Sequence, residues 1–166
     1  MKKLLFLAAA FITGFAAMAQ QKADDVAKVN ADQYSFGKIK QGVPVTTYFT
    51  ITNVSDKPLV IESAWASCGC TTPEWSKEPI APNSTSKVKV GYNAANAMPF
   101  TKEVYVKFAG IQEPKIVRIT GEVLEAKAYD AYTQTDEFKQ AEKARQDQDE
   151  KAAKEAKKAD KKAGKA

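Results

Sequence analysis

The chain has 166 residues, a formal net charge of +5, two cysteines and no histidine. The charge is uneven: seven lysines against Glu155 and Asp160 give residues 151–166 a charge of +5, whereas residues 20–150 sum to −2. A basic C-terminal tip, rather than a basic domain face, argues against nucleic-acid binding. Without histidine, the chain has no Ser-His or Cys-His pair for nucleophilic catalysis.

The N-terminus has the pattern of an export signal. A short basic start, Met1 to Lys3, precedes an apolar run from Leu4 to Phe15, and Ala17-Met18-Ala19 fits a signal-peptidase site. We therefore expect a signal peptide at 1–19, which is too short for a membrane span of about 20 apolar residues. The mature protein is expected in a periplasm or outside the cell, with no transmembrane segment after cleavage.

The middle of the chain has the pattern of an all-β sandwich. Residues 20–31 are polar and expected to be loose, whereas 32–124 contain six or seven short alternating segments separated by turn residues. Between Val45 and Asn53, period-two alternation places Phe49 and Ile51 on the core face. Each strand would supply an apolar face to one two-layer core.

Residues 125–166 form a tail rich in Ala, Lys and Glu. These residues favour helix, and Thr135 can cap a helix with Asp136 in its first turn. Because no apolar stripe is visible, we expect a charged tail, either helical or disordered, that stays solvated.

The two cysteines stand one residue apart, as Cys68-Gly69-Cys70. A disulfide across three residues adds only about 1.6 kcal/mol in the chain-entropy model, and the backbone must bend at Gly69 to allow it. Three interpretations remain: small buried residues or a local clip, a thiol-exchange or metal site, and a partner contact. Two thiolates fall short of a closed zinc site, so the metal best suited to them is Cu(I).

Two tryptophans flank the cysteines. Trp65 lies in a strand and is expected in the core, whereas Trp75, beside Pro73, is a loop anchor or an exposed contact. Trp65, Thr71 and Trp75 are therefore the candidate residues of a contact loop around the possible disulfide or redox pair.

Five short motifs resemble a known bacterial family, the domain of unknown function 1573 family. They are Phe36-Gly37, Phe49 to Asn53, Cys68-Gly69-Cys70-Thr71, Ile80-Ala81-Pro82 and Gly121-Glu122-Val123. The resemblance covers about residues 32–124 and implies an exported Ig-like antiparallel β-sandwich of about seven strands. The family has no assigned activity to transfer. Asn83 stands where the family pattern favours glycine, and Asn tolerates the positive φ that such a turn needs.

The combined prediction is a non-enzymatic Ig-like binding or structural module of the bacterial envelope, without a cofactor. Its partner would be another envelope protein, bound through a sheet edge or the Cys68–Trp75 loop by strand addition. The alternative is a thiol-redox or Cu(I)-handling protein that acts through Cys68 and Cys70.

Overall fold

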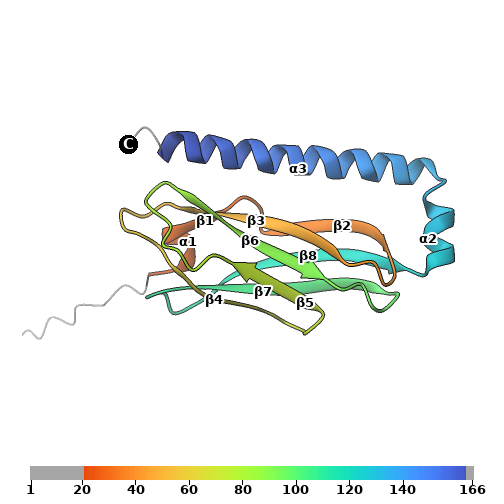
Figure 1. Cartoon of the computed structure of the whole chain (residues 1–166), viewed down its shortest axis with the longest axis horizontal. Helices are drawn as coiled ribbons and strands as arrows, with labels where there is room; N and C mark the ends of the chain where they lie inside the picture. Colours follow the sequence, from red (N-terminus) through yellow and green to blue (C-terminus); the bar gives the residue numbers. More distant parts are fainter. Residues whose placement is uncertain (1–20, 164–166) are drawn as a thin grey trace, which may run out of the picture.

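The computed structural model describes residues 21–163, and the expected signal peptide at 1–19 lies outside the described residues. Two four-stranded sheets stack face to face (Figure 1). Sheet A has the order β1 (Ala27–Val29), β3 (Val45–Asn53), β6 (Thr85–Tyr92), β5 (Thr71–Trp75); sheet B has the order β2 (Gln33–Lys40), β8 (Lys115–Leu124), β7 (Pro99–Phe108), β4 (Ile61–Ala66). These orders correspond to the ABED and GFC sheets of immunoglobulin domains, so the Ig-like sandwich prediction is confirmed.

One strand pair departs from the expected antiparallel pattern. Strand β2 runs parallel to β8, whereas the other strand pairs are antiparallel. The chain forms β1 at the edge of sheet A and then crosses to the edge of sheet B, where it forms β2. There β2 runs in the same direction as its neighbour β8. The described chain therefore has four strands in each sheet, one more in total than the expected seven.

The core lies between the two sheets and follows the alternation of the sequence. Phe49 and Ile51, predicted on the core face of β3, are 1% and 0% exposed. The neighbouring strand β6 and the facing strands β7 and β8 contribute mainly valine and isoleucine, all fully buried: Val88, Val90, Val104, Val106, Val117 and Ile119. Burial of branched side chains from both inner faces is what holds the two layers together.

The prediction that residues 20–31 are loose was wrong. Residues Ala23–Val26 form a short helix, α1, and Ala27 begins β1, paired with β3. Ala23, Val26 and Ala27 are buried in the main core cluster. Three small apolar residues in a polar stretch give almost no periodic signal, which is why the sequence did not reveal this element.

The C-terminal tail is helical, which is one of the two forms expected from the sequence. It also contacts the sandwich, so it is not fully solvated. Helix α2 (Ala126–Tyr132) turns the chain back, and α3 (Asp136–Ala163) runs along the sandwich beside β1, β2 and β3 (Figure 1). Tyr132 is buried, and the Tyr34 hydroxyl donates to Asp149 Oδ1 at 3.2 Å. Lys38 Nζ also lies 2.7 Å from Glu137 Oε1.

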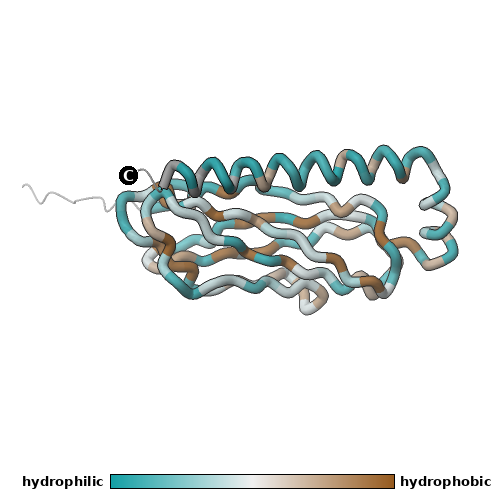
Figure 2. The backbone as a smooth tube through the Cα atoms, turned by 45° about the horizontal axis from the view of Figure 1, so that its top comes forward, coloured by the Kyte–Doolittle hydropathy of each residue, from teal (hydrophilic) through white to brown (hydrophobic). Residues whose placement is uncertain are grey.

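Helix α3 covers the sandwich with a face that is not apolar. Its described half-buried residues recur at helical spacing: Phe138, Ala141, Glu142, Arg145, Gln148 and Ala152. Figure 2 shows the helix as predominantly hydrophilic along its length. An alanine and polar face lacks the hydrophobic stripe that sequence reasoning looks for. No helix within residues 21–163 is both long and apolar enough to cross a membrane.

Candidate functional site

The cysteine motif forms the corner where the chain passes from sheet B to sheet A. Residues 67–70 join β4 to β5, the edge strands on the side of the sandwich away from α3 (Figure 1). Cys68 and Cys70 form a disulfide, with their Cα atoms 5.3 Å apart, within the usual range for such a bond. The chain bends at this turn as the Cys-Gly-Cys spacing predicted. A bonded pair has no free thiolate to offer a metal ion.

Backbone hydrogen bonds hold this corner on both sides. The Ser67 amide donates to the Glu103 carbonyl of β7 at 3.0 Å, which anchors the corner to sheet B. The Asn93 amide donates to the Cys70 carbonyl at 3.1 Å and anchors it close to the end of β6 in sheet A. The Thr71 amide closes the turn on the Cys68 carbonyl at 3.3 Å. The disulfide therefore spans a turn that other bonds already fix.

Thr71 is buried directly beneath the disulfide. Its Oγ1 lies 3.8 Å from Cys68 Sγ and 3.9 Å from Cys70 Sγ. Disulfide sulfurs carry no hydrogen, so the threonine hydroxyl is the donor in these weak contacts. Both cysteines are half-buried, but Cys70 is the one packed against the core cluster.

The prediction that Trp65 belongs to the core was wrong. Its side chain is 44% exposed, although Ile61 on the same strand is buried. The pairing of β4 with β7 shifts between Ile61 and Ser63, which marks a β-bulge. One extra residue reverses the inward and outward faces beyond it, so strict alternation from Ile61 gave the wrong face for Trp65.

Trp65 is the edge of an aromatic row on the outer face of sheet B. The aromatic row consists of the two rings of Trp65 and Tyr105, on β4 and β7, together with the aliphatic Ile116 opposite Tyr105 on β8. The indole and phenol rings stack at 5.4 Å with an interplanar angle of 8°, and Ile116 is 38% exposed. Sequence alternation could place Tyr105 and Ile116 on an outer face, but only the strand register brings them into line with Trp65.

A charged network borders the aromatic row. The Tyr105 hydroxyl donates to Glu103 Oε2 at 2.7 Å, and Arg118 lies 3.0 Å from Glu103 Oε1. The hydrogen bond to Glu103 raises the pKa of Tyr105. Hydrogen bonds from Tyr105 and then Arg118 lower the pKa of Glu103. The aromatic row is therefore bordered by the ion pair of Glu103 with Arg118, whereas the row itself is mainly apolar.

The segment from Cys68 to Trp75 is not one loop. Residues Thr71–Trp75 form edge strand β5, and Pro73 pairs opposite Val90 within it. Proline is compatible with a strand at a sheet edge, where its missing N–H leaves no ladder bond unmade. Trp75 is half-buried, and its indole N–H donates to the Ile61 carbonyl at 3.2 Å, so it is an anchor between the two sheets.

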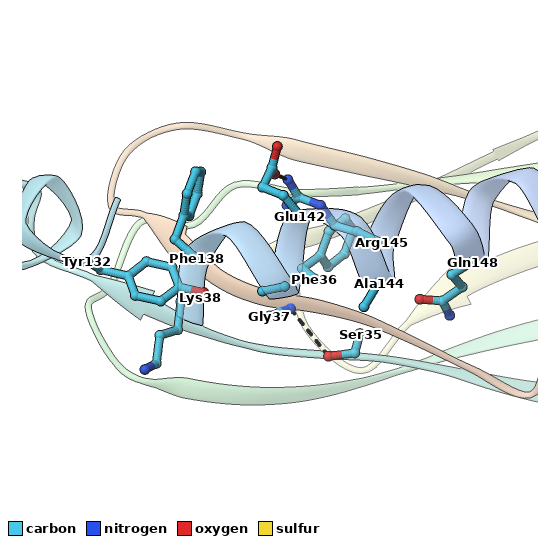
Figure 3. Close-up of a pocket in the computed structure, with 11 residues that line it drawn as sticks. Ser35, Phe36, Gly37, Lys38, Tyr132, Phe138, Glu142, Ala144, Arg145 and Gln148 are labelled. Atoms are coloured by element: carbon cyan, nitrogen blue, oxygen red, sulfur yellow. Dashed lines mark hydrogen bonds and ion pairs between the residues drawn. The ribbon is translucent and has the colours of Figure 1, made fainter. Parts of the chain in front are cut away.

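A hollow lies between α3 and the sandwich, away from the cysteine corner (Figure 3). It has a volume of about 210 Å³ and is lined by β2 residues from Ser35 to Lys38 and by both tail helices. Tyr132 and Phe138 meet edge to face at 5.4 Å, and Arg145 pairs with Glu142. The charged groups that line the hollow are thus already paired, because Lys38 also pairs with Glu137. Within residues 21–163, no three His, Cys, Asp or Glu side chains gather in a way that could hold a metal ion.

The fold and the corner together define an Ig-like sandwich domain. The turn that connects its two sheets carries a disulfide, and helices lie along one side of the sandwich. Residues 27–123 match the model of a family described as "Protein of unknown function (DUF1573)". The chain belongs to this family. The match extends the expected boundary from residue 32 to residue 27, which is where β1 begins.

Solved structures share the fold at low sequence identity. A protein of unknown function from Porphyromonas gingivalis W83 is 15% identical, with a TM-score of 0.51, over 64% of this chain and 50% of that one. The VesB protease of Vibrio cholerae is 18% identical, with a TM-score of 0.50, over 61% of this chain and 33% of that one. The chain thus spans half or less of these proteins. No curated protein sequence matches it.

Proposed function

We propose that this protein is a non-enzymatic binding module of the bacterial envelope that accepts a strand from a protein partner along β4. The observation that supports this proposal is an open sheet edge directly beside the aromatic row. Main-chain hydrogen bonds to an added strand would supply affinity, and the exposed aromatic side chains would supply specificity.

Strand β4 is the edge best suited to strand addition. Strand β5 carries Pro73, and β1 has only three residues. Strand β2 is bordered by the tail helices, through ion pairs such as Lys40 with Asp130 at 2.8 Å. Prolines, short strands and covering elements are the usual ways in which proteins protect sheet edges. Strand β4 has a bulge between Ile61 and Ser63, but from Ser63 to Ala66 it has no proline, and the tail helices lie on the other side of the sandwich.

The backbone of β4 presents groups for pairing. Among the described strands it pairs with β7 alone, and the Ser67 amide donates to the Glu103 carbonyl on that side. Antiparallel strands alternate, so the N–H and C=O groups of Ala64 and Ala66 point away from β7. Their side chains lie on the inner face, where Ala66 packs against the core cluster, so they do not obstruct a strand added in the plane of the sheet. Trp65 lies between them, on the outer face.

The proposal can be tested by blocking this edge. In Ala64→Pro the outward N–H is removed at an edge position where proline is tolerated. We expect the variant to fold, as judged by circular dichroism, and to lose binding of the partner identified with wild-type protein. Trp65→Ala should weaken the same binding at least about 30-fold, the usual loss at an interface hot spot. Thr72→Ala on β5 is the matched control and should bind normally.

Photo-crosslinking identifies the partner and tests the edge at once. A photoreactive aromatic side chain in place of the exposed Trp65 should give one dominant product in envelope extracts, and the same group at Glu74 on β5 should not. A product with twice the mass of the chain would identify a second copy as the partner. Normal binding by a folded Ala64→Pro variant, or equal crosslinking from both positions, would refute the proposal.

A further inference from the structure

We propose that the Cys68–Cys70 disulfide is a thiol–disulfide exchange site that accepts electrons from a dithiol. This activity goes beyond the binding function proposed above, and neither proposal depends on the other. It rests on three observations: the corner does not need the bond, one sulfur is the better point of attack, and a buried hydroxyl stands beside the leaving sulfur.

The first observation concerns the need for the bond. The corner is fixed to sheet B through Ser67 and to sheet A through Cys70, in both cases by backbone hydrogen bonds. A ring that encloses only Gly69 also restricts the unfolded chain very little. Reduction would therefore leave the fold in place, and the two thiols would stay close enough to re-form the bond.

The second observation concerns access. Gly69 is exposed, and apart from the neighbouring cysteines a Cβ placed on it would meet no atom within 4 Å, so no other part of the described chain covers the turn at this residue. Cys70 packs against the core cluster, whereas Cys68 does not. An incoming thiolate needs a clear line to the sulfur that it attacks. Cys68 Sγ is therefore the point of attack, and Cys70 is the leaving group.

The third observation concerns the leaving group. Thr71 is buried, and its hydroxyl lies 3.9 Å from Cys70 Sγ and 3.8 Å from Cys68 Sγ. It can therefore donate to whichever sulfur leaves, and the difference in access assigns that sulfur to Cys70. A donor at this position stabilises the thiolate that forms when the bond breaks, because hydrogen bonds to an ionised group are stronger than those to a neutral one. A leaving thiol with a lower pKa departs faster. Thr71 is thus a positioning residue for the exchange.

The step balances as follows. One thiolate of the dithiol attacks Cys68 Sγ, the Cys68–Cys70 bond breaks, and Cys70 leaves as a thiolate that takes up a proton. The second thiol of the reductant loses its proton and attacks the reductant sulfur that is bonded to Cys68 Sγ. This releases Cys68 as a thiolate, which is then protonated. The reductant becomes a disulfide, and the chain gains two electrons and two protons. Its sequence has no third cysteine, so the electrons must leave through the same pair.

The first test measures whether exchange occurs in the folded protein. Native protein is treated with dithiothreitol, quenched with an alkylating reagent at intervals, and analysed by intact mass. Because no other part of the described chain covers the turn at Gly69, reduction should be no more than about tenfold slower than in guanidinium chloride. Circular dichroism of the reduced protein should match that of the oxidised form. Reduction that occurs only at the rate of global unfolding would overturn the proposal.

The second test assigns the two sulfurs. Cys70→Ser leaves only Cys68, and Cys68→Ser leaves only Cys70; each variant is mixed with oxidised glutathione. Cys68 should form the mixed disulfide at least about tenfold faster, because Cys70 packs against the core. Equal rates, or faster reaction at Cys70, would contradict the assigned direction of attack.

The third test separates the role of the Thr71 hydroxyl from its packing. Thr71→Val keeps the shape and removes the donor, whereas Thr71→Ser keeps the donor. In the Cys68→Ser background, the pH profile of alkylation should move to higher pH with valine and stay in place with serine, since the hydroxyl stabilises the Cys70 thiolate. Unchanged profiles in both variants would remove Thr71 from the mechanism.

Discussion

Gly121 lies at the tightest backbone contact among the glycines described. An added Cβ would stand 2.8 Å from the Gly37 carbonyl oxygen and 2.8 Å from two ring atoms of Phe100. Phe100 is the residue opposite Gly121 in the β7–β8 pair, and Gly37 lies within the register shift between β2 and β8. The β2 backbone and the Phe100 ring thus lie so close to β8 that only a hydrogen atom fits in the Cβ position of Gly121.

The substitution Gly121→Ala should therefore destabilise the sandwich. The obstacle on one side is a backbone carbonyl, which can move only if β2 moves with it. Overpacking of this kind costs about 1–3 kcal/mol. For a domain of this size the expected fall in Tm is roughly 4–12 °C, since about 1 kcal/mol shifts Tm by 4–8 °C in domains of 60–100 residues and by less in larger ones.

Gly91→Ala is the matched control, because a Cβ there would meet nothing closer than the Thr72 carbonyl oxygen at 3.7 Å. Replacing a strand glycine without a clash stabilises by about 0.5–1 kcal/mol. Urea unfolding of both variants and wild type, followed by circular dichroism, gives the two free-energy changes. Equal stabilities for the two variants would refute the reasoning, because the only difference invoked is the space around each Cβ.

Three further predictions test other parts of the molecule. Truncation after Glu125 should leave a cooperatively folding sandwich in urea unfolding, because no residue of the tail belongs to the main core cluster; a chain without a folding transition would contradict this. Asn53→Ala should cost about 1–3 kcal/mol in the same assay, because the fully buried amide donates to the Lys57 and Ile80 carbonyls at 2.7 and 2.8 Å, and both acceptors would lose a partner. The Tyr105 phenol should ionise at higher pH than free tyrosine in an ultraviolet titration, because its hydrogen bond to Glu103 favours the protonated form, and Glu103→Gln should lower that pKa.

Local alternation was sufficient to predict most of the sandwich. In β3 and the strands after Pro82, one face is apolar and the other polar, so period two identified both the strands and their buried side chains. Alternation failed wherever an element lacks that contrast. Strand β1 is three residues long, and α3 covers the sandwich with alanine and polar side chains. Such elements are ordered by their tertiary neighbours, which a local pattern does not contain.

The site was only partly predictable for a related reason. The close spacing of Cys68 and Cys70 was enough to raise a disulfide with a bend at Gly69, because both depend on neighbouring residues alone. The exposed position of Trp65 depends on a bulge, and its stacking on Tyr105 depends on the register of β4 against β7. Register is a long-range property, and a shift of one residue exchanges the faces.

The five short motifs named in the sequence analysis have unequal physical explanations in this fold. Gly121 has no room for a Cβ beside the Gly37 carbonyl, and Gly37 itself has a positive φ of 64°. Asn53 is fully buried and donates to the carbonyl of the buried Ile80, so the fold explains all four positions. The Cys68–Thr71 motif is different, because backbone hydrogen bonds already meet the structural needs of its turn. A disulfide with a buried hydroxyl beneath it and an exposed glycine in its ring adds little to the fold. The exchange that we propose would give this disulfide a role, and that role is separate from the strand-addition site proposed on β4.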